Sequence, residues 1–104
     1  LLLQTLRVLM QFSPSNIKPE EIEKELLKLG YIENVHHLHV WQLNDKDIHL
    51  EAHLDFSEDI QLSEVSKVIQ DVKALLREKF HINHSVLQPE FGIDDSKDLI
   101  VNER

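Results

Sequence analysis

Residues 48–56 alternate without interruption between apolar and polar side chains. The apolar set is Ile48, Leu50, Ala52, Leu54 and Phe56. The polar set is His49, Glu51, His53 and Asp55. A period of two residues places the two sets on opposite faces of a β-strand. The chain must therefore build a sheet with one apolar face, which helices have to cover, and a second face that carries histidines and carboxylates.

The segment after this strand predicts the covering helix and another strand. Residues 62–80 carry apolar side chains at helical spacing, namely Val65, Val68, Ile69, Val72, Leu75, Leu76 and Phe80. Residues 85–91, SVLQPEF, read as a strand, and Pro89 indicates a sheet edge because proline donates no ladder hydrogen bond. A helix that connects two strands forms a crossover, so strands 48–56 and 85–91 are expected to run parallel.

Two elements precede the alternating strand. Pro19 suits the first position of a helix, and the acidic residues after it lie where the helix dipole favours them. Residues 19–29 therefore predict a helix, which Gly30 ends. Residues 35–43, VHHLHVWQL, read as a strand, and the following NDKD predicts a turn into strand 48–56.

These elements predict an α+β fold with the order α-β-β-α-β. Two helices cover one face of a three-stranded mixed sheet, in a two-layer sandwich close to a ferredoxin-like fold that lacks its first strand. A chain of 104 residues is long enough for one core. We assign residues 1–12 to a short helix or linker, residues 13–91 to the domain and residues 92–104 to a flexible tail. Because the chain lacks an initiating Met, we expect it to be a piece of a longer protein.

The pairing of the two hairpin strands decides which histidines share the uncovered face. If NDKD closes the hairpin with Leu43 opposite Ile48, then His36 lies opposite Asp55. His36 becomes a diagonal neighbour of His53 on the uncovered face, within reach of a shared small ligand. A shift of the pairing by one residue would reverse this assignment.

The same alternation assigns the remaining candidates. His37 and His39 are expected on the opposite face, beside Trp41. Glu90 in the last strand is expected on the uncovered face, near the two imidazoles of His36 and His53. Two imidazoles and a carboxylate form the ligand set of many zinc sites that retain an open position.

Composition limits the chemistry of this face. The chain has no cysteine, so a metal site has to use imidazole and carboxylate ligands, which suit zinc and similar divalent ions. Eleven basic and nineteen acidic residues give a net charge of −8, which argues against a nucleic-acid partner and suits cations. Catalysis is not expected, because no nucleophile pairs with a base and two glycines build no phosphate-binding loop. Spacing alone leaves two interpretations open: a metal site, or histidines that are solvated surface residues.

Four segments, SPSNIKPEEIEKELLKLGYIENV, VHHLHVWQL, HLEAHLDF and FHINHSVLQPE, occur in this order and spacing up to Phe91. Together they resemble the cytoplasmic C-terminal domain of the cation diffusion facilitator family of zinc transporters. Family members show a similar His-x-Leu-His-x-Trp strand, a histidine in the second strand and an Ile-x-His-x-Thr-Ile-Gln-x-Glu ending. Val86 and Leu87 depart from the Thr-Ile of that ending, and Pro89 is uncommon there.

The resemblance implies a set of metal ligands. His36 matches the histidine that opens the first-strand motif, and His53 matches the second-strand ligand. Glu90 matches the acidic residue after the Gln of the last strand. His84 matches a frequent histidine before that strand, with a less settled role.

The resemblance leaves the fourth ligand open. Some relatives place a histidine at the start of the long helix, where this chain has SEDIQLSEVS. Glu58 or Asp59 would have to substitute for it, or a partner chain or water would complete the site. His37 and His39 are expected to pack with Trp41 as core residues of the family fold.

The resemblance also implies a function. Such domains lie at the cytoplasmic face of a membrane below six transmembrane helices and form homodimers, while the membrane part exchanges metal for protons. Zinc, or another divalent ion, bound near the dimer contact favours the active transporter. The expected partners are therefore a second copy, the transmembrane domain of the same transporter and divalent metal ions. Two alternatives remain: a metal-independent dimerisation module, and a free-standing ferredoxin-like regulator that binds another ligand.

Overall fold

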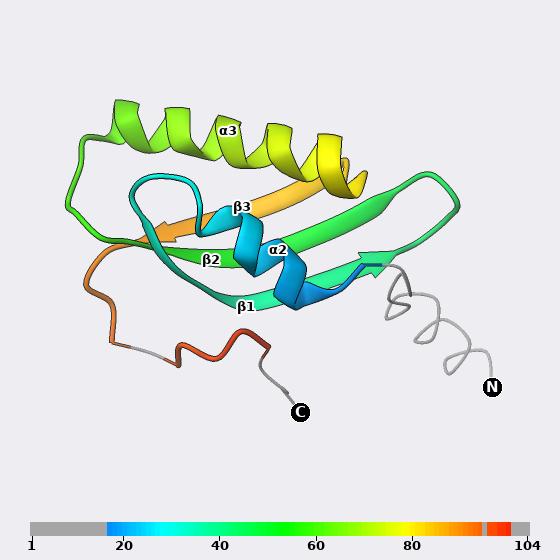
Figure 1. The fold of residues 1–104 in the computed structure, drawn as a ribbon, viewed down its shortest axis with the longest axis horizontal. Helices are drawn as coiled ribbons and strands as arrows, with labels where there is room; N and C mark the ends of the chain where they lie inside the picture. Colours follow the sequence, from blue (N-terminus) through cyan, green and yellow to red (C-terminus); the bar gives the residue numbers. More distant parts are fainter. Residues whose placement is uncertain (1–16, 95, 101–104) are drawn as a thin grey trace.

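The computed structural model describes residues 17–94 and 96–100, and the helix or linker expected at residues 1–12 lies outside them. Five elements follow one another in the described part of the chain (Figure 1). They are helix α2 Pro19–Leu26, strand β1 Ile32–Gln42, strand β2 Ile48–Phe56, helix α3 Leu62–Phe80 and strand β3 His84–Glu90. The predicted order α-β-β-α-β is confirmed.

The boundaries agree best where one periodicity governs a whole element. β2 and α3 have the predicted bounds. Helix α2 ends at Leu26 and not at residue 29 as predicted. The N–H of Leu29 donates a hydrogen bond to the carbonyl of Leu26, three residues earlier (3.1 Å), so the chain continues there as a tighter turn. The left-handed residue after the helix is Tyr31 (φ 75°) and not Gly30.

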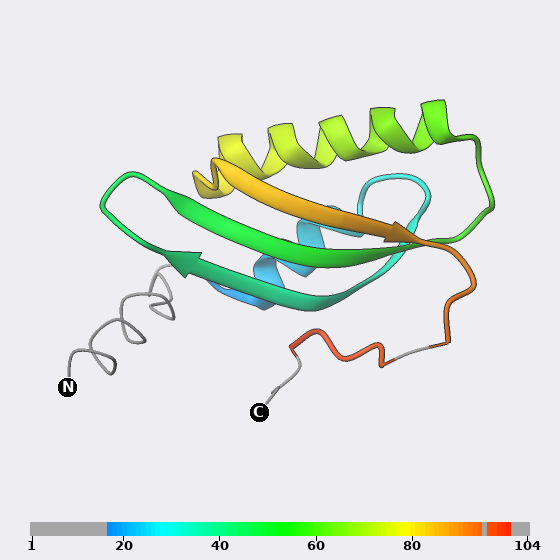
Figure 2. The ribbon, with the colours of Figure 1, turned by 180° about the vertical axis from the view of Figure 1, so that it is seen from behind.

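Strand β2 forms the centre of a mixed sheet. It pairs with β1 in the antiparallel sense and with β3 in the parallel sense, as predicted. Pro89 thus lies in an edge strand. The helices cover one face of the sheet, and Figure 2, seen from behind, shows the strands on the side that faces away from them.

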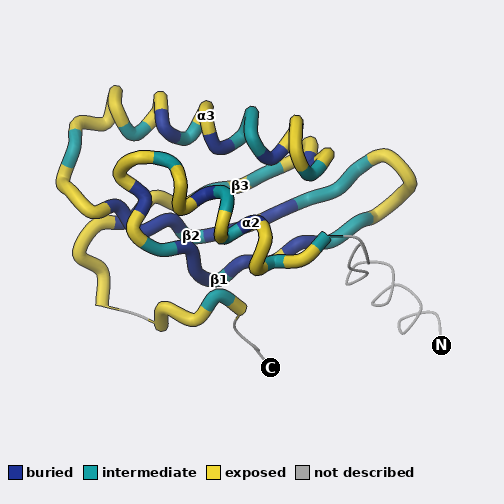
Figure 3. Tube along the Cα trace, in the orientation of Figure 1, coloured by how far each residue is buried: buried dark blue, intermediate teal, exposed yellow. Residues whose placement is uncertain are grey.

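The core lies between the helices and the sheet, and the chain is buried along the inner faces of both layers (Figure 3). It contains apolar side chains from both helices and from β1 and β2. The buried apolar residues are Ile22, Leu26, Ile32, Val35, Leu38, Val40, Leu50, Ala52, Leu54, Phe56, Val68, Val72, Leu76 and Ile82. The apolar half of the alternating strand therefore faces the helices, and its polar half faces away.

The pairing of β1 with β2 differs from the predicted one. Gln42 and not Leu43 lies opposite Ile48, so the hairpin loop is one residue longer than NDKD. The side chain of Asn44 stabilises this loop by accepting two backbone hydrogen bonds within it (2.8 and 2.9 Å). A shift of one residue, taken alone, would turn His36 toward the helices.

A bulge in β1 cancels the effect of this shift on the face to which His36 points. The pairing slips by one further residue between His39, which lies opposite Glu51, and His36, which lies opposite His53. Within the bulge His37 adopts a left-handed backbone conformation (φ 53°). His36 therefore returns to the predicted, uncovered face, although its partner across the strands is His53 rather than an aspartate.

The end of the described chain runs along the outer edge of β1 (Figure 2). The backbone N–H groups of His37 and Leu38 donate hydrogen bonds to the carbonyl oxygens of Asp98 and Leu99 (3.0 and 2.6 Å). These bonds satisfy N–H groups at the bulge that would otherwise lack a partner in the sheet. Residues 96–99 consequently lie beside the part of β1 that carries the histidines; the flexibility of residues 92–104 stays a prediction.

We expect Leu54→Ala to lower the free energy of unfolding by about 2–5 kcal/mol, because it leaves a cavity at a fully buried position of the central strand. Urea unfolding followed by circular dichroism measures the loss. Leu62→Ala is the matched control, since Leu62 is 78% exposed and its truncation should change the stability by less than about 0.5 kcal/mol. Equal losses in both variants would contradict the placement of the core.

Candidate metal centre

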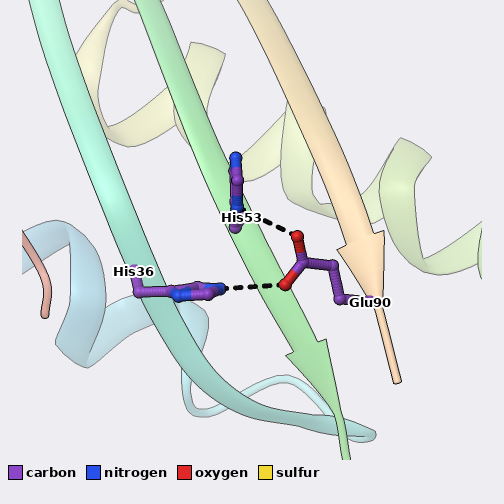
Figure 4. Close-up of side chains that lie close together, drawn as sticks. All are labelled: His36, His53 and Glu90. Atoms are coloured by element: carbon purple, nitrogen blue, oxygen red, sulfur yellow. Dashed lines mark hydrogen bonds and ion pairs between the residues drawn. The ribbon is translucent and has the colours of Figure 1, made fainter. Parts of the chain in front are cut away.

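Three side chains from three neighbouring strands meet on the uncovered face of the sheet. His36 comes from β1, His53 from β2 and Glu90 from the last residue of β3 (Figure 4). The pairing explains the meeting, because His36 lies opposite His53 while Asp55, two residues along β2, lies opposite Glu90. The structure thus brings together the three residues that the sequence predicted.

The ligand atoms of this cluster are close to one another. Nε2 of His36 lies 3.2 Å from Oε1 of Glu90, and Nδ1 of His53 lies 3.0 Å from Oε2. One nitrogen or oxygen from each residue falls within 4.8 Å of the other two. The two imidazole rings stand nearly perpendicular, at 86° and 5.1 Å between centroids. A single ion placed among these atoms would contact all three residues.

The cluster is buried although it is polar. The side chain of His36 is fully buried, and the side chain of Glu90 is 6% exposed. A buried carboxylate is costly unless a positive charge or several hydrogen bonds offset its loss of water. Gln88 donates one hydrogen bond to Oε2 of Glu90 (2.8 Å), which also orients the carboxylate. Two of the three polar side chains are therefore buried in the uncovered face of the sheet, while the side chain of His53 is 26% exposed.

The backbone fixes which nitrogen of His36 carries a proton. Nδ1 lies 2.7 Å from the carbonyl oxygen of Ser96, and a carbonyl only accepts, so Nδ1 must donate. In the neutral ring Nε2 then presents a lone pair to Oε1 of Glu90. Nε2 and Oε1 lie at hydrogen-bond distance (3.2 Å), so either a proton on Nε2 of the charged ring or a metal ion in the place of that proton joins them. A histidine held by a carbonyl in this way is the usual arrangement of a metal-binding imidazole.

The ring of His53 also lies close to the carboxylate of Glu90. Its Nδ1 is buried and has no hydrogen-bond partner among the residues that the structure describes. The nearby oxygen of Glu90 forms an ion pair with it at 3.0 Å, but does not have the geometry of a hydrogen bond with the ring nitrogen. Glu90 thus approaches both imidazoles, but only His36 has the geometry of a hydrogen bond with it.

Asp55 borders the cluster and was missed as a candidate. Its Oδ2 lies 3.6 Å from Nε2 of His36 and accepts a hydrogen bond from the side-chain amide of Asn34 (3.1 Å). Its Oδ1 accepts a hydrogen bond from Nζ of Lys97 (3.2 Å). The alternation of residues 48–56 could have indicated Asp55, which shares a face with His53, whereas no local pattern indicates Lys97.

The structure does not bring His84 to the cluster. It begins β3, six residues before Glu90, a separation of about 20 Å along a strand. Its ring stacks on His49 (4.4 Å), and its Nε2 lies 3.3 Å from Oδ1 of Asp47. Hydrogen bonds from the side chains of Asn44 and then Asn83 hold the pKa of Asp47 below its ordinary value.

Two further expectations are wrong. His37 and His39 do not face away from the cluster: the ring of His37 stacks on His53 (4.6 Å), and His39 lies opposite Glu51 and beside Trp41 (4.8 Å) on the uncovered face. The cause is the shifted pairing and the bulge described above.

No other cluster of this kind is found in residues 17–94 and 96–100. The group formed by His36, His53 and Glu90 is the one set of three or more histidine, cysteine or acidic residues that could hold a metal ion there. Glu58 and Asp59, the candidates for a fourth ligand, do not belong to it. Among the same described residues, no helix is long and apolar enough to span a membrane.

The fold and the cluster together define a class: a small α+β sandwich whose uncovered face carries two histidines and a glutamate that could hold a metal ion. Residues 14–91 match the sequence model of a family described as cation efflux protein, cytoplasmic domain. The chain belongs to this family. The resemblance of its motifs to the cytoplasmic domain of these transporters is confirmed.

Curated relatives are much longer than this chain. The proton-coupled zinc antiporter SLC30A1 of Homo sapiens is 36% identical over 105 residues, which cover 97% of this chain and 19% of the relative. The metal cation efflux system protein CzcD of Cupriavidus metallidurans is 29% identical over 92 residues, which cover 88% of this chain and 28% of the relative. The chain thus spans about a fifth of the length of SLC30A1.

Solved structures share the fold. The metal-bound C-terminal domain of the CzcD transporter from Cupriavidus metallidurans aligns with a TM-score of 0.61 at 28% identity, over 71% of this chain and 99% of the other. The zinc form of the zinc transporter CzrB aligns with a TM-score of 0.67 at 19% identity, over 84% of this chain and 99% of the other. At that identity the second likeness supports the fold alone.

In the metal-free chain we expect the neutral imidazole of His36 to carry its proton on Nδ1, because the carbonyl of Ser96 can only accept a hydrogen bond. Two-dimensional ¹⁵N NMR of the imidazole nitrogens distinguishes the two ring tautomers. His81, exposed at the end of α3, provides the internal reference. A His36 signal with its proton on Nε2 alone would contradict the assignment.

Proposed function

We propose that this chain is the cytoplasmic regulatory and dimerisation domain of a divalent-metal efflux transporter and that it binds zinc through His36, His53 and Glu90. In this proposal the domain has no catalytic role and acts on a transmembrane domain of the same protein that exchanges metal for protons. The family supports the transporter, and the names of two relatives, a zinc antiporter and a metal cation efflux protein, support the metal. The sequence model of the family is named for a dimer.

The single observation that carries the metal site is the orientation of His36. Its Nδ1 is held by a backbone carbonyl, so its Nε2 is the nitrogen that faces the buried carboxylate of Glu90, at a hydrogen-bond distance of 3.2 Å. A bound zinc ion would supply two positive charges between these two atoms, in the place of a proton on Nε2. The residues fit such an ion, because tetrahedral zinc with ligand bonds of 2.0–2.2 Å separates its ligand atoms by about 3.4 Å.

The donor set also suits a sensor. Imidazole and carboxylate ligands hold zinc without the thiolates of closed structural sites, so the ion can leave when its concentration falls. Because His36, His53 and Glu90 come from three strands, an ion that binds them links all three strands of the sheet. The uncovered face around them carries Trp41 and the exposed Val86, which suit a contact with a second copy.

A metal-independent dimerisation module is the second candidate. The ring stacks of Trp41 with His49 and of His49 with His84 favour it, because they occupy the uncovered face without any ion. Sedimentation velocity with and without zinc separates the candidates. A dimer of equal affinity under both conditions, in a chain that binds no zinc, would favour the second one.

We expect this chain to bind zinc in a saturable manner at pH 7.5 and His53→Ala to weaken binding at least tenfold, a loss of about 1.4 kcal/mol, because one ligand is removed. Isothermal titration calorimetry of the purified chain measures both affinities. His84→Ala is the matched control: it also removes one imidazole from the uncovered face, but far from the cluster, and should leave the affinity unchanged. Equal binding in all three proteins, or none, would refute the proposed site.

Zinc binding should weaken as the pH falls from 7.5 to 5.5. Histidine ligands must be neutral to bind a metal, so protons compete with zinc for the same nitrogen atoms. Titrations at pH 7.5 and pH 5.5 measure the change, with the unfolding curve of the metal-free chain at both values as the control for an intact fold. Unchanged affinity would argue against histidine ligation.

A further inference from the structure

We propose that Asp55 is the fourth metal ligand of this site and that Lys97 is an internal cation that occupies Asp55 until a metal ion binds. This inference rests on the proposed function, which supplies the first three ligands. It adds a ligand and a competitor that lie on β2 and on the segment after β3.

The position of Asp55 fits a fourth ligand. Its Oδ2 lies 3.6 Å from Nε2 of His36, and Oε1 of Glu90 lies 3.2 Å from the same nitrogen. Both distances are near the roughly 3.4 Å that separates two ligand atoms on tetrahedral zinc. Asp55 lies two residues after His53 on the same face of β2, and it lies opposite Glu90 of β3. Asp55 stands outside the set of three residues whose ligand atoms lie within 4.8 Å of one another, so a turn of its side chain toward His53 is needed to complete four protein ligands.

The two carboxylates near His36 explain why a positive charge is needed beside Asp55 when no metal is bound. The side chains of Asp55 and Glu90 are only 9% and 6% exposed, and both approach the same nitrogen of His36. Two buried carboxylates repel each other strongly unless positive charge is near. Lys97 supplies one such charge through its contact with Oδ1 of Asp55 (3.2 Å).

Lys97 can leave Asp55 when a metal ion binds. Its side chain is 42% exposed, so the ammonium group can return to water at little cost in desolvation. It also donates a hydrogen bond to the carbonyl of Ile93 on its own segment (2.8 Å), which gives it a second partner. A divalent ion at the cluster repels the ammonium group and attracts the carboxylate, so metal and Lys97 compete for Asp55.

The segment that carries Lys97 therefore acts on the site in two opposite ways. The Ser96 carbonyl holds the proton of His36 on Nδ1 and so makes Nε2 the nitrogen that can bind a metal, while the next residue offers a competing cation. The competition lowers the apparent affinity for metal, so the domain responds at a higher metal concentration than the four ligands alone would set. Zinc and similar divalent cations are the ligand class concerned.

The test is zinc calorimetry on this chain and on Lys97→Met, Asp55→Asn and the double variant. Lys97→Met, which keeps an apolar stem and removes the charge, should tighten zinc binding roughly threefold to tenfold. Asp55→Asn keeps the shape and the bond to Asn34, and should weaken binding at least tenfold. In the double variant the gain from Lys97→Met should fall below about twofold, because the group for which Lys97 competes is gone.

Two controls separate these roles from a change of fold or of net charge. Lys67→Met removes one charge from the exposed face of α3 and should leave the affinity within about twofold. With Co²⁺ in place of zinc, the visible absorption should change in Asp55→Asn and stay the same in Lys97→Met, because only the former alters the ligands.

The outcomes distinguish this inference from the proposed function. If the unaltered chain binds no zinc, or if His53→Ala binds as well as it does, both ideas fail. If His53→Ala weakens binding but Asp55→Asn changes neither the affinity nor the Co²⁺ spectrum, the fourth ligand alone is refuted. If Lys97→Met weakens zinc binding, Lys97 supports the site and the competition is refuted.

Discussion

The pairing of His36 with His53 across β1 and β2 is the contact on which the candidate metal site depends. The hairpin loop leaves the strands in a register that, continued without change, would place His36 among the apolar side chains under the helices. The bulge at His37 moves His36 to the uncovered face. The carbonyl groups of residues 98 and 99 accept hydrogen bonds from the N–H groups of His37 and Leu38. Residues 98 and 99 are thus part of what positions His36 on β1.

Much of the fold could be predicted from local periodicity. The strict alternation of β2 and the apolar stripe of α3 determine their bounds, because each pattern requires one face to be buried along its whole length. The face of His36 was also predicted correctly, but from a wrong pairing that differs from the true one by an even number of residues. The loop shift depends on the local cap by Asn44, which composition did not single out, and the bulge depends on contacts with residues 98 and 99, which no short window of residues contains.

The same distinction applies to the site. His53 and Glu90 lie at predictable positions of their strands and meet once the order of the strands is known, whereas His36 joins them only because of the bulge in β1. Ser96 and Lys97 lie in a segment without periodicity, and their contacts with His36 and Asp55 arise only in three dimensions. Sequence patterns therefore predict which groups could bind a cation better than they predict what holds those groups in place.

The two edges of the sheet limit how this domain can associate. An open edge is a template on which a strand of another molecule can add. Residues 96–99 already occupy the outer edge of β1, and Pro89 interrupts the row of backbone donors on β3. Strand addition, which leads exposed sheet edges into aggregation, is thereby discouraged at both edges. Association through the sheet is therefore left to its broad face, where side chains and not backbone groups decide which partner fits.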